Sequence, residues 1–164
     1  MIRIGSLLVI AAAVAVAVAL AVLLTRSSSS EGGHALGATA RAADVRVGHG
    51  RLGRMLVDDH GRTLYLFLED SRGHSVCSGR CARVWPPATV TGTPRAGAGV
   101  RRGLLATTSR GDARQLVYRG HPLYRMIADT RPGDMVGQGF LGTWFVVSPA
   151  GRRLGKASAP AEGY

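Results

Sequence analysis

The sequence predicts a mainly β fold with a minor helical part, in which two homologous hairpin-rich repeats pack into one domain. The first observation is a motif that returns at a constant offset of 59 positions. Its matching positions are Leu64, Tyr65 and Asp70 in the first copy and Leu123, Tyr124 and Asp129 in the second. The only two tryptophans, Trp85 and Trp144, keep the same offset. Short apolar runs also alternate with turns that contain glycine and aspartate, which is typical of β-hairpins. A fixed period of this kind indicates a duplicated structural unit.

The N-terminal region is separate from this domain. Residues 4–24 form an apolar run of 21 residues without a charge. A helix of that length is ~30 Å long, which matches the hydrocarbon core of a bilayer. We therefore expect residues 1–25 to be a signal anchor or transmembrane helix, with a cleaved signal peptide as the alternative. Residues 26–43, rich in serine, glycine and alanine, predict a flexible linker, and residues 154–164 predict a disordered tail.

The folded part is expected at residues 44–153, with repeat one at 44–90 and repeat two at 103–153. Repeat one contains strand patterns at 45–47, 54–58 and 63–69, and the turn at 59–61 favours a hairpin between the last two. A short helix should follow, capped by Ser75 and ended by the two prolines after Trp85. The strand patterns of repeat two lie at 104–108, 114–118, 122–128 and 143–148.

The net charge of +11 arises almost entirely from arginine, which accounts for 20 of the 21 cationic residues. The arginines are scattered, and they do not form the aromatic-rich basic strip that single-stranded nucleic acid prefers. We therefore expect no nucleic acid partner. The expected partners are the membrane, through the N-terminal helix, and an envelope polymer or protein of unknown identity.

The tyrosine and aspartate of each motif lie five positions apart, which places their side chains on opposite faces of a straight strand. A direct bond between Tyr65 and Asp70, or between Tyr124 and Asp129, is therefore not expected. We expect each tyrosine to bury its ring and bond its hydroxyl to backbone, and each aspartate to shape the following turn. The alternative is a ligand site where the two copies face one another. The two tryptophans are expected to be core anchors.

Cys77 and Cys81 lie four positions apart, close enough for the ~4.4 to 6.8 Å Cα separation of a disulfide. In an exported domain a structural disulfide is the simplest interpretation. Two alternatives remain, namely a copper or other thiophilic metal site formed with His74, and a thiol-exchange centre. The remaining histidines, including His60 and His121, occur in tether, loop or turn positions and are interpreted as solvated.

The paired Leu-Tyr-x4-Asp motifs are accompanied by Cys-x3-Cys and Trp-Pro-Pro after the first copy and by Gly-Thr-Trp-Phe-Val-Val-Ser-Pro at the end of the second. In these features the sequence resembles the bacterial secreted-repeat proteins, also described as predicted lipoproteins with a Tyr-x-aromatic-x-x-Asp motif. Phe67 occupies the aromatic position in the first copy, whereas Met126 replaces it in the second. The resemblance implies a β-rich two-repeat fold and an extracytoplasmic location, and it implies no reaction.

These observations favour a non-enzymatic binding or scaffolding module of the cell envelope, tethered to the membrane or secreted if the N-terminal helix is cleaved. The sequence predicts no catalytic residues and no cofactor. The alternative function is a redox or copper-handling accessory that uses the Cys-x3-Cys segment. A third and weaker hypothesis is an enzyme that acts on envelope material.

Overall fold

The computed structural model describes residues 43–155, and the protein is mainly β within that range. The predicted signal anchor, nearly all of the linker and nearly all of the tail lie outside the described residues. The strands are β1 (Val45–Gly50), β2 (Gly53–Asp58), β3 (Tyr65–Phe67), β4 (Thr89–Val90), β5 (Leu105–Arg110), β6 (Ala113–Tyr118), β7 (His121–Pro122) and β8 (Trp144–Val146). The helical elements are α2 (Arg80–Val84) and two 3₁₀ turns, η2 (Arg102–Leu104) and η3 (Phe140–Gly142). No helix in this part of the chain is long and apolar enough to cross a membrane.

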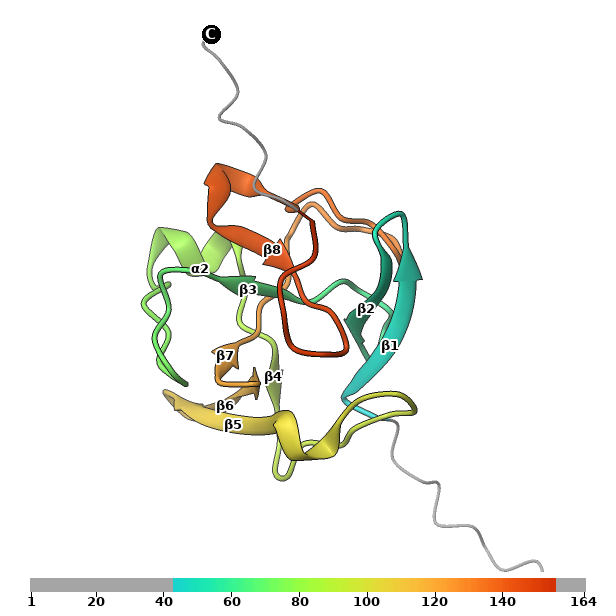
Figure 1. Ribbon diagram of the computed structural model, residues 1–164. Coiled ribbons are helices and arrows are strands. Elements are labelled where there is room, and N and C mark those ends of the chain that lie inside the picture. The colour runs from blue at the N-terminus through green and yellow to red at the C-terminus, as the bar shows by residue number, and fades with distance from the viewer. Residues whose placement is uncertain (1–42, 156–164) are drawn as a thin grey trace, which may run out of the picture. The chain divides into compact units, whose positions relative to one another are not determined.

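Each repeat begins with a hairpin of the same register. In the first, β1 pairs with β2 from Val45 opposite Asp58 to Gly50 opposite Gly53. In the second, β5 pairs with β6 from Leu105 opposite Tyr118 to Arg110 opposite Ala113. Equivalent hairpin residues are thus 60 positions apart, whereas the motif residues are 59 apart, because the turn after β6 is one residue shorter. Figure 1 shows the β1–β2 hairpin at the right and the β5–β6 hairpin below, with β3 and β8 above.

The predicted hairpin between 54–58 and 63–69 is present only at its closed end. Val57 and Thr63 form an isolated bridge, and the Leu64 N–H donates to Leu56 O at 3.0 Å. Beyond that point β3 pairs antiparallel with β8, which belongs to the other repeat. The expectation was wrong because the backbone groups of β3 are bonded to a partner almost 80 positions away, which local turn chemistry does not reveal.

The two repeats meet around a local two-fold axis. Tyr65 and Tyr124, which are equivalent by sequence, exchange two backbone hydrogen bonds of 2.9 and 3.0 Å. Residues that exchange both bonds of an antiparallel pair face each other across a local two-fold axis. The same motif therefore forms both sides of the junction between the repeats.

The segment that ends each repeat completes the sheet of the other repeat. Val147 donates its N–H to Leu64 O at 3.1 Å and accepts from the Leu56 N–H at 2.8 Å. The corresponding bonds of Ala88 go to Leu123 O at 2.9 Å and come from the Leu116 N–H at 2.8 Å. The sequence repeat and the structural unit are therefore different, because each unit contains an exchanged segment.

The short helix lies after the first motif as predicted, but its start differs. Helix α2 begins at Arg80 after Gly79, whose φ of 53° lies in the left-handed region, and no side chain caps it. Ser75 is not the cap, because its hydroxyl is bonded to the Tyr124 hydroxyl at 2.6 Å instead. The helix ends at Val84, before Trp85 and the two prolines.

Two groups of buried side chains form the core. The first lies between the hairpins and is aliphatic with two aromatic rings: Val45, Leu56, Leu64, Leu66, Ala88, Leu116, Tyr118, Leu123, Phe145 and Val147. The second surrounds the junction of the repeats and contains most of the motif residues: Met55, Val57, Tyr65, Cys77, Trp85, Tyr124, Met135, Trp144 and Val146. The second group positions the candidate site.

Candidate functional site

The motif tyrosines and aspartates are paired across the two repeats. The Tyr65 hydroxyl donates to Asp129 Oδ2 at 2.5 Å, and the Tyr124 hydroxyl donates to Asp70 Oδ2 at 2.6 Å. The other oxygen of each carboxylate accepts a backbone N–H of the following loop, from Val136 at 2.8 Å and from Val76 at 2.9 Å. We call these two arrangements the crossed pairs. Each one ties the tyrosine segment of one repeat to a loop of the other.

This geometry corrects one expectation and supports another. The expected bond of each hydroxyl to backbone is incomplete. Each tyrosine hydroxyl donates to the aspartate of the opposite copy, because the local two-fold axis brings them together, and the Tyr65 hydroxyl also has a backbone hydrogen bond with Gly137. Each aspartate does hold the loop that follows it, as expected from turn chemistry. No bond joins the tyrosine and aspartate of one copy, in agreement with their odd spacing along a strand.

The crossed pairs hold two tryptophans face to face. Trp85 and Trp144 stack with ring centroids 3.9 Å apart and an interplanar angle of 3°. Tyr65 contacts Trp85 edge-on at 5.2 Å, and Tyr124 contacts Trp144 in the same way at 5.1 Å. Both tryptophans are almost fully buried, at 2% and 3% exposure, which is what a core anchor requires.

The two repeats differ in this stack at the aromatic position of the motif, which is Phe67 in repeat one and Met126 in repeat two. Phe67 stacks on Trp144 at 4.2 Å, so three rings form a continuous column. Met126, at the equivalent position of repeat two, is partly buried against the same core group. Phe140 of η3 also contacts Trp85, with a ring tilted by 56° at 5.8 Å. The column is therefore extended on one side by η3.

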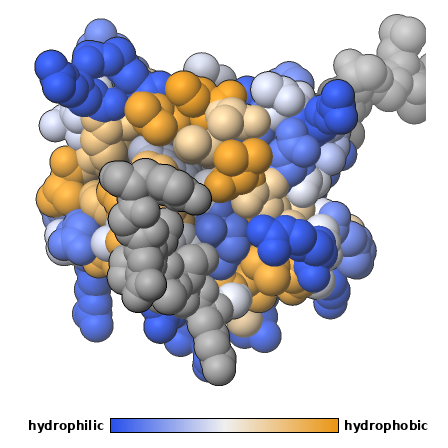
Figure 2. All heavy atoms as spheres, turned by 90° about the horizontal axis from the view of Figure 1, so that it is seen from above, coloured by the Kyte–Doolittle hydropathy of each residue, from blue (hydrophilic) through white to orange (hydrophobic). Residues whose placement is uncertain are grey.

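A groove of about 430 Å³ opens beside this column, and we call it the aromatic groove. Its apolar lining comes from both repeats: Phe67, Cys81, Val84, Trp85, Phe140, Leu141 and Trp144. Glu69 and Arg80 are the charged residues of the lining. Phe140 is 43% exposed and Leu141 is 80% exposed. Figure 2 shows apolar residues gathered among hydrophilic ones on the face seen from above.

The two cysteines form a disulfide that borders this groove. Cys77 and Cys81 are bonded, with Cα atoms 5.2 Å apart. Cys77 is buried, while Cys81 lines the groove at the second residue of α2. Because a disulfide sulfur is not a thiolate, this form offers no thiolate ligand for copper. His74 is exposed, and its Nδ1 lies 2.9 Å from the Arg72 carbonyl oxygen.

The crossed pair of Tyr124 and Asp70 is surrounded by further polar groups that sequence reasoning missed. Ser75 bonds the Tyr124 hydroxyl, and Arg110 bonds both Ser75 Oγ and the Cys77 carbonyl. His121 is half-buried rather than solvated, and burial lowers its pKa while Asp70 opposes that shift. Burial raises the pKa of the Asp70 carboxyl, against hydrogen bonds from Tyr124 and Val76. The Ser75 and Arg110 contacts have no signal in the repeat pattern, because neither residue recurs. Asp134 stands at the position equivalent to Ser75, and Gly50 stands at the position equivalent to Arg110.

The other crossed pair lies in the interior. Asp129 is 4% exposed and Tyr65 is fully buried. Burial raises the pKa of the Asp129 carboxyl, hydrogen bonds from Tyr65 and Val136 oppose the shift, and the nearby Asp134 adds to it. Burial and the carboxylate likewise raise the pKa of the Tyr65 hydroxyl. The raised pKa of Tyr65 keeps its hydroxyl neutral as the donor to Asp129.

Asp58 forms a third buried junction, between β2 and repeat two. Its Oδ2 accepts from Arg125 Nε at 2.7 Å and from Arg62 Nε at 3.0 Å. Its Oδ1 accepts the N–H groups of His60 and Arg62, each at 2.9 Å, as turn chemistry predicts. Burial favours a raised pKa for Asp58, but these hydrogen bonds and the two guanidinium charges outweigh it, so the pKa is lowered.

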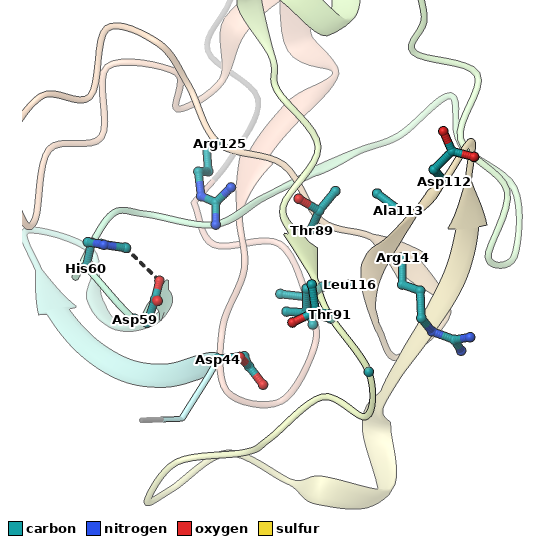
Figure 3. Close-up of a pocket in the computed structure, with 12 residues that line it drawn as sticks. Asp44, Asp59, His60, Thr89, Thr91, Asp112, Ala113, Arg114, Leu116 and Arg125 are labelled. Atoms are coloured by element: carbon teal, nitrogen blue, oxygen red, sulfur yellow. Dashed lines mark hydrogen bonds and ion pairs between the residues drawn. The ribbon is translucent and has the colours of Figure 1, made fainter. Parts of the chain in front are cut away.

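A second cavity, of about 610 Å³, lies next to this junction. Figure 3 shows Arg125 pointing toward it from above, with Asp59 bonded to His60 at one side and Thr89 and Thr91 on β4 and just after it. Within the described part of the chain, one group of three acidic, histidine or cysteine side chains has its ligand atoms within 4.8 Å, namely Asp58, Asp59 and His60. Asp58 is already bonded to two arginines, so this group is better explained as a structural turn.

Comparison with known proteins supports the two-repeat organisation. A family model described as "Secreted repeat of unknown function" matches residues 47–89 and again residues 105–148. Together the two matches cover more than half of the 164 residues and coincide with the two copies that meet at the local two-fold axis. No curated protein and no solved structure matches the chain. The chain therefore belongs to the family of secreted repeats of unknown function and carries two copies of the repeat.

Proposed function

We propose that this chain is a non-enzymatic binding module of the cell envelope and that the aromatic groove is its binding site. The observation that carries the proposal is the exposure of Phe140 and Leu141 beside a stacked aromatic column. Large apolar side chains gathered at the surface typically mark a ligand or partner site. An extracytoplasmic location agrees with the family of secreted repeats.

The lining of the groove indicates an apolar ligand. Phe67 and Trp85 come from repeat one, and Phe140 and Trp144 come from repeat two, so the groove exists only when the repeats are paired. Glu69 and Arg80 can orient a polar end of the ligand, while the rest of the lining offers apolar contact. On the sequence expectation, residues 4–24 hold this module at the membrane.

The polar groups of the site support binding rather than catalysis. The crossed pairs are engaged with each other and with neighbouring backbone, and neither carboxylate belongs to the lining of the groove. A catalytic acid or base needs access to the reacting atom. The redox or copper-handling alternative requires that the Cys77–Cys81 disulfide first be reduced.

The test uses the fluorescent apolar probe anilinonaphthalene sulfonate with a chain that begins at residue 26, whose folding is first checked by near-UV circular dichroism. We expect saturable binding with energy transfer from tryptophan, because both tryptophans border the groove. The double variant F140S/L141S should lose most of this signal. The control I127S alters an apolar residue of 58% exposure outside the groove lining and should keep it. Equal probe binding by F140S/L141S and the unaltered chain would contradict the proposal.

A further inference from the structure

We propose that the partner of the aromatic groove is the surface of an anionic lipid bilayer, into which the segment 139–142 inserts. This inference rests on the proposed function and names its ligand. We call the segment Gly139-Phe140-Leu141-Gly142 the apolar tip. It forms η3 with its flanking glycine and stands at one wall of the groove.

The backbone of the apolar tip holds its side chains outward. Gly139, Leu141 and Gly142 have φ values of 75°, 50° and 68°, which lie in the left-handed region. Glycine adopts that region freely, but a leucine there is strained. Strain of this kind persists only where the surrounding structure imposes it, and it is concentrated at functional sites. Here the strained residue is also the most exposed of the large apolar side chains, at 80%.

Neighbouring residues widen the apolar surface. Leu68 is 43% exposed, and its N–H donates to the Thr143 carbonyl at 2.9 Å, directly after the tip. The lining of the groove presents the exposed side chains of Phe140 and Leu141, and Leu68 is a further exposed leucine whose backbone is bonded next to the tip. Phenylalanine and leucine are the side chains with which interfacial proteins enter the boundary between headgroups and acyl chains.

The charge of the domain complements an anionic surface. Residues 43–155 contain 17 arginines and eight acidic residues, a formal charge of +9. Helix α2 contributes Arg80, Cys81 and Val84 to the groove lining and carries two exposed arginines, Arg80 and Arg83. Glu69 is the acidic residue of the lining. Arginine beside an apolar insertion is the combination that anionic headgroups attract.

The sequence also places such a surface within reach. On the expectation that residues 26–43 form a flexible linker after an anchor, 18 residues span a root-mean-square distance of about 25 Å. A tethered domain meets the bilayer at high effective concentration, so a weak second contact is enough to keep it docked. Stable attachment to a membrane generally requires two such signals.

The experiment measures tryptophan quenching in the full chain, reconstituted into vesicles of anionic phospholipid with and without brominated acyl chains. Bromine quenches at short range, and the only tryptophans, Trp85 and Trp144, lie at the groove. We expect a loss of emission in the brominated anionic vesicles, a smaller loss in F140S/L141S, and a loss in I127S equal to that of the unaltered chain. Neutral brominated vesicles should quench less than anionic ones.

Three outcomes would overturn the inference. The first is unchanged emission in brominated vesicles, which would place the groove away from the bilayer. The second is equal quenching of F140S/L141S and the unaltered chain, which would show contact by another face. The third is that a second copy of the chain, or added envelope polysaccharide, covers the groove while bromine does not quench the tryptophans. That last result would reject the bilayer as the partner while leaving the groove as a binding site. If the unaltered chain also failed to bind anilinonaphthalene sulfonate, both proposals would be rejected.

Discussion

Tyr65 and Asp129 meet in the interior, whereas Tyr124 and Asp70 meet beside Ser75, Arg110 and a half-buried histidine. The two crossed pairs have the same bonds, the same edge-on contact with a tryptophan and the same role in closing a loop. Their surroundings differ because Ser75 and Arg110 have no counterpart in the other copy. The shared bonds are therefore part of the scaffold, and the differences show where this protein departs from its own symmetry.

The largest expected effect separates the two pairs by stability. Asp129→Ala removes the acceptor of the buried Tyr65 hydroxyl and of the Val136 N–H. It should therefore lower the free energy of unfolding by about 3 kcal/mol. Asp70→Ala should cost about 1 kcal/mol, because Tyr124 retains Ser75 as a partner and water reaches the site. Urea unfolding followed by tryptophan fluorescence measures both. Equal losses would show that the two pairs contribute alike.

The next-largest effect concerns the residue that follows the backbone N–H bonded to each motif aspartate. Gly137 follows Val136, and Cys77 follows Val76 at the equivalent place in repeat one. A Cβ at Gly137 would lie 2.8 Å from Trp85 Cζ3 and 3.1 Å from Tyr65 Cε1. Gly137→Ala should therefore cost about 2 to 3 kcal/mol through overpacking and shift the tryptophan emission. Gly103→Ala is the matched control, because neither glycine has a left-handed φ and no atom lies near a Cβ added at Gly103, so it should leave that emission unchanged.

The disulfide lies on the side of the Tyr124–Asp70 pair and has no counterpart beside the Tyr65–Asp129 pair. Its sequence separation of 4 predicts that the double variant C77A/C81A loses about 2 kcal/mol, since closure of a short loop constrains the unfolded chain least. Arg110 bonds the Cys77 carbonyl, so we also expect greater acrylamide quenching of the tryptophans as α2 loosens. If reduction of the unaltered chain increases acrylamide quenching equally, the increase is due to loss of the Cys77–Cys81 bond. A chain that keeps its stability without the bond would contradict the structural role.

The smallest effect is a difference in pH dependence. The raised pKa of Asp129 means that its contribution to stability is full below the ordinary value of 3.8 and is lost as pH rises through its folded pKa. For Asp58 the pKa is lowered, so its contribution is present above 3.8 and is lost as pH falls through the folded pKa.

Asp129→Asn should therefore remove a fall in stability between acid and neutral pH, and Asp58→Asn should remove a loss at acid pH. Asp70→Asn should change the profile less than Asp129→Asn, because Arg110 and His121 oppose the rise in the Asp70 pKa whereas Asp134 adds to that of Asp129. Unfolding free energies measured across this range test the signs.

Much of the fold could be predicted from the sequence, because a repeat of fixed offset indicates duplication regardless of what the repeated residues contact. The mainly β class, the approximate positions of most strands and the short helix near Trp85 follow from that offset and from local turn signals. The disulfide followed from spacing and the exported context. What spacing does not contain is the partner of each motif residue. Tyr65 is bonded to Asp129 rather than to a residue of its own repeat, because the two-fold axis lies between the copies.

The candidate site was harder to predict for the same reason. The aromatic groove combines α2 of one repeat with η3 of the other, so no single stretch of sequence displays it. One signal was available in Phe140 and Leu141, two large apolar residues between glycines in a loop. Apolar residues of this size in a glycine-containing loop indicate an exposed apolar surface. Ser75 and Arg110 gave no signal, because each lies in a different repeat and neither recurs.

The exchanged segments also bear on the ancestry of the protein. Val147 completes the sheet of repeat one and Ala88 completes the sheet of repeat two, so a solitary repeat lacks the strand that its own sheet requires. An ancestor with a single repeat would have had to pair with an identical chain and trade the same segments, forming a symmetric homodimer. Fusion of two such genes removed the need for identical halves. In a fused chain the halves can differ, and here repeat one alone carries the disulfide and Ser75, while repeat two alone carries Arg110.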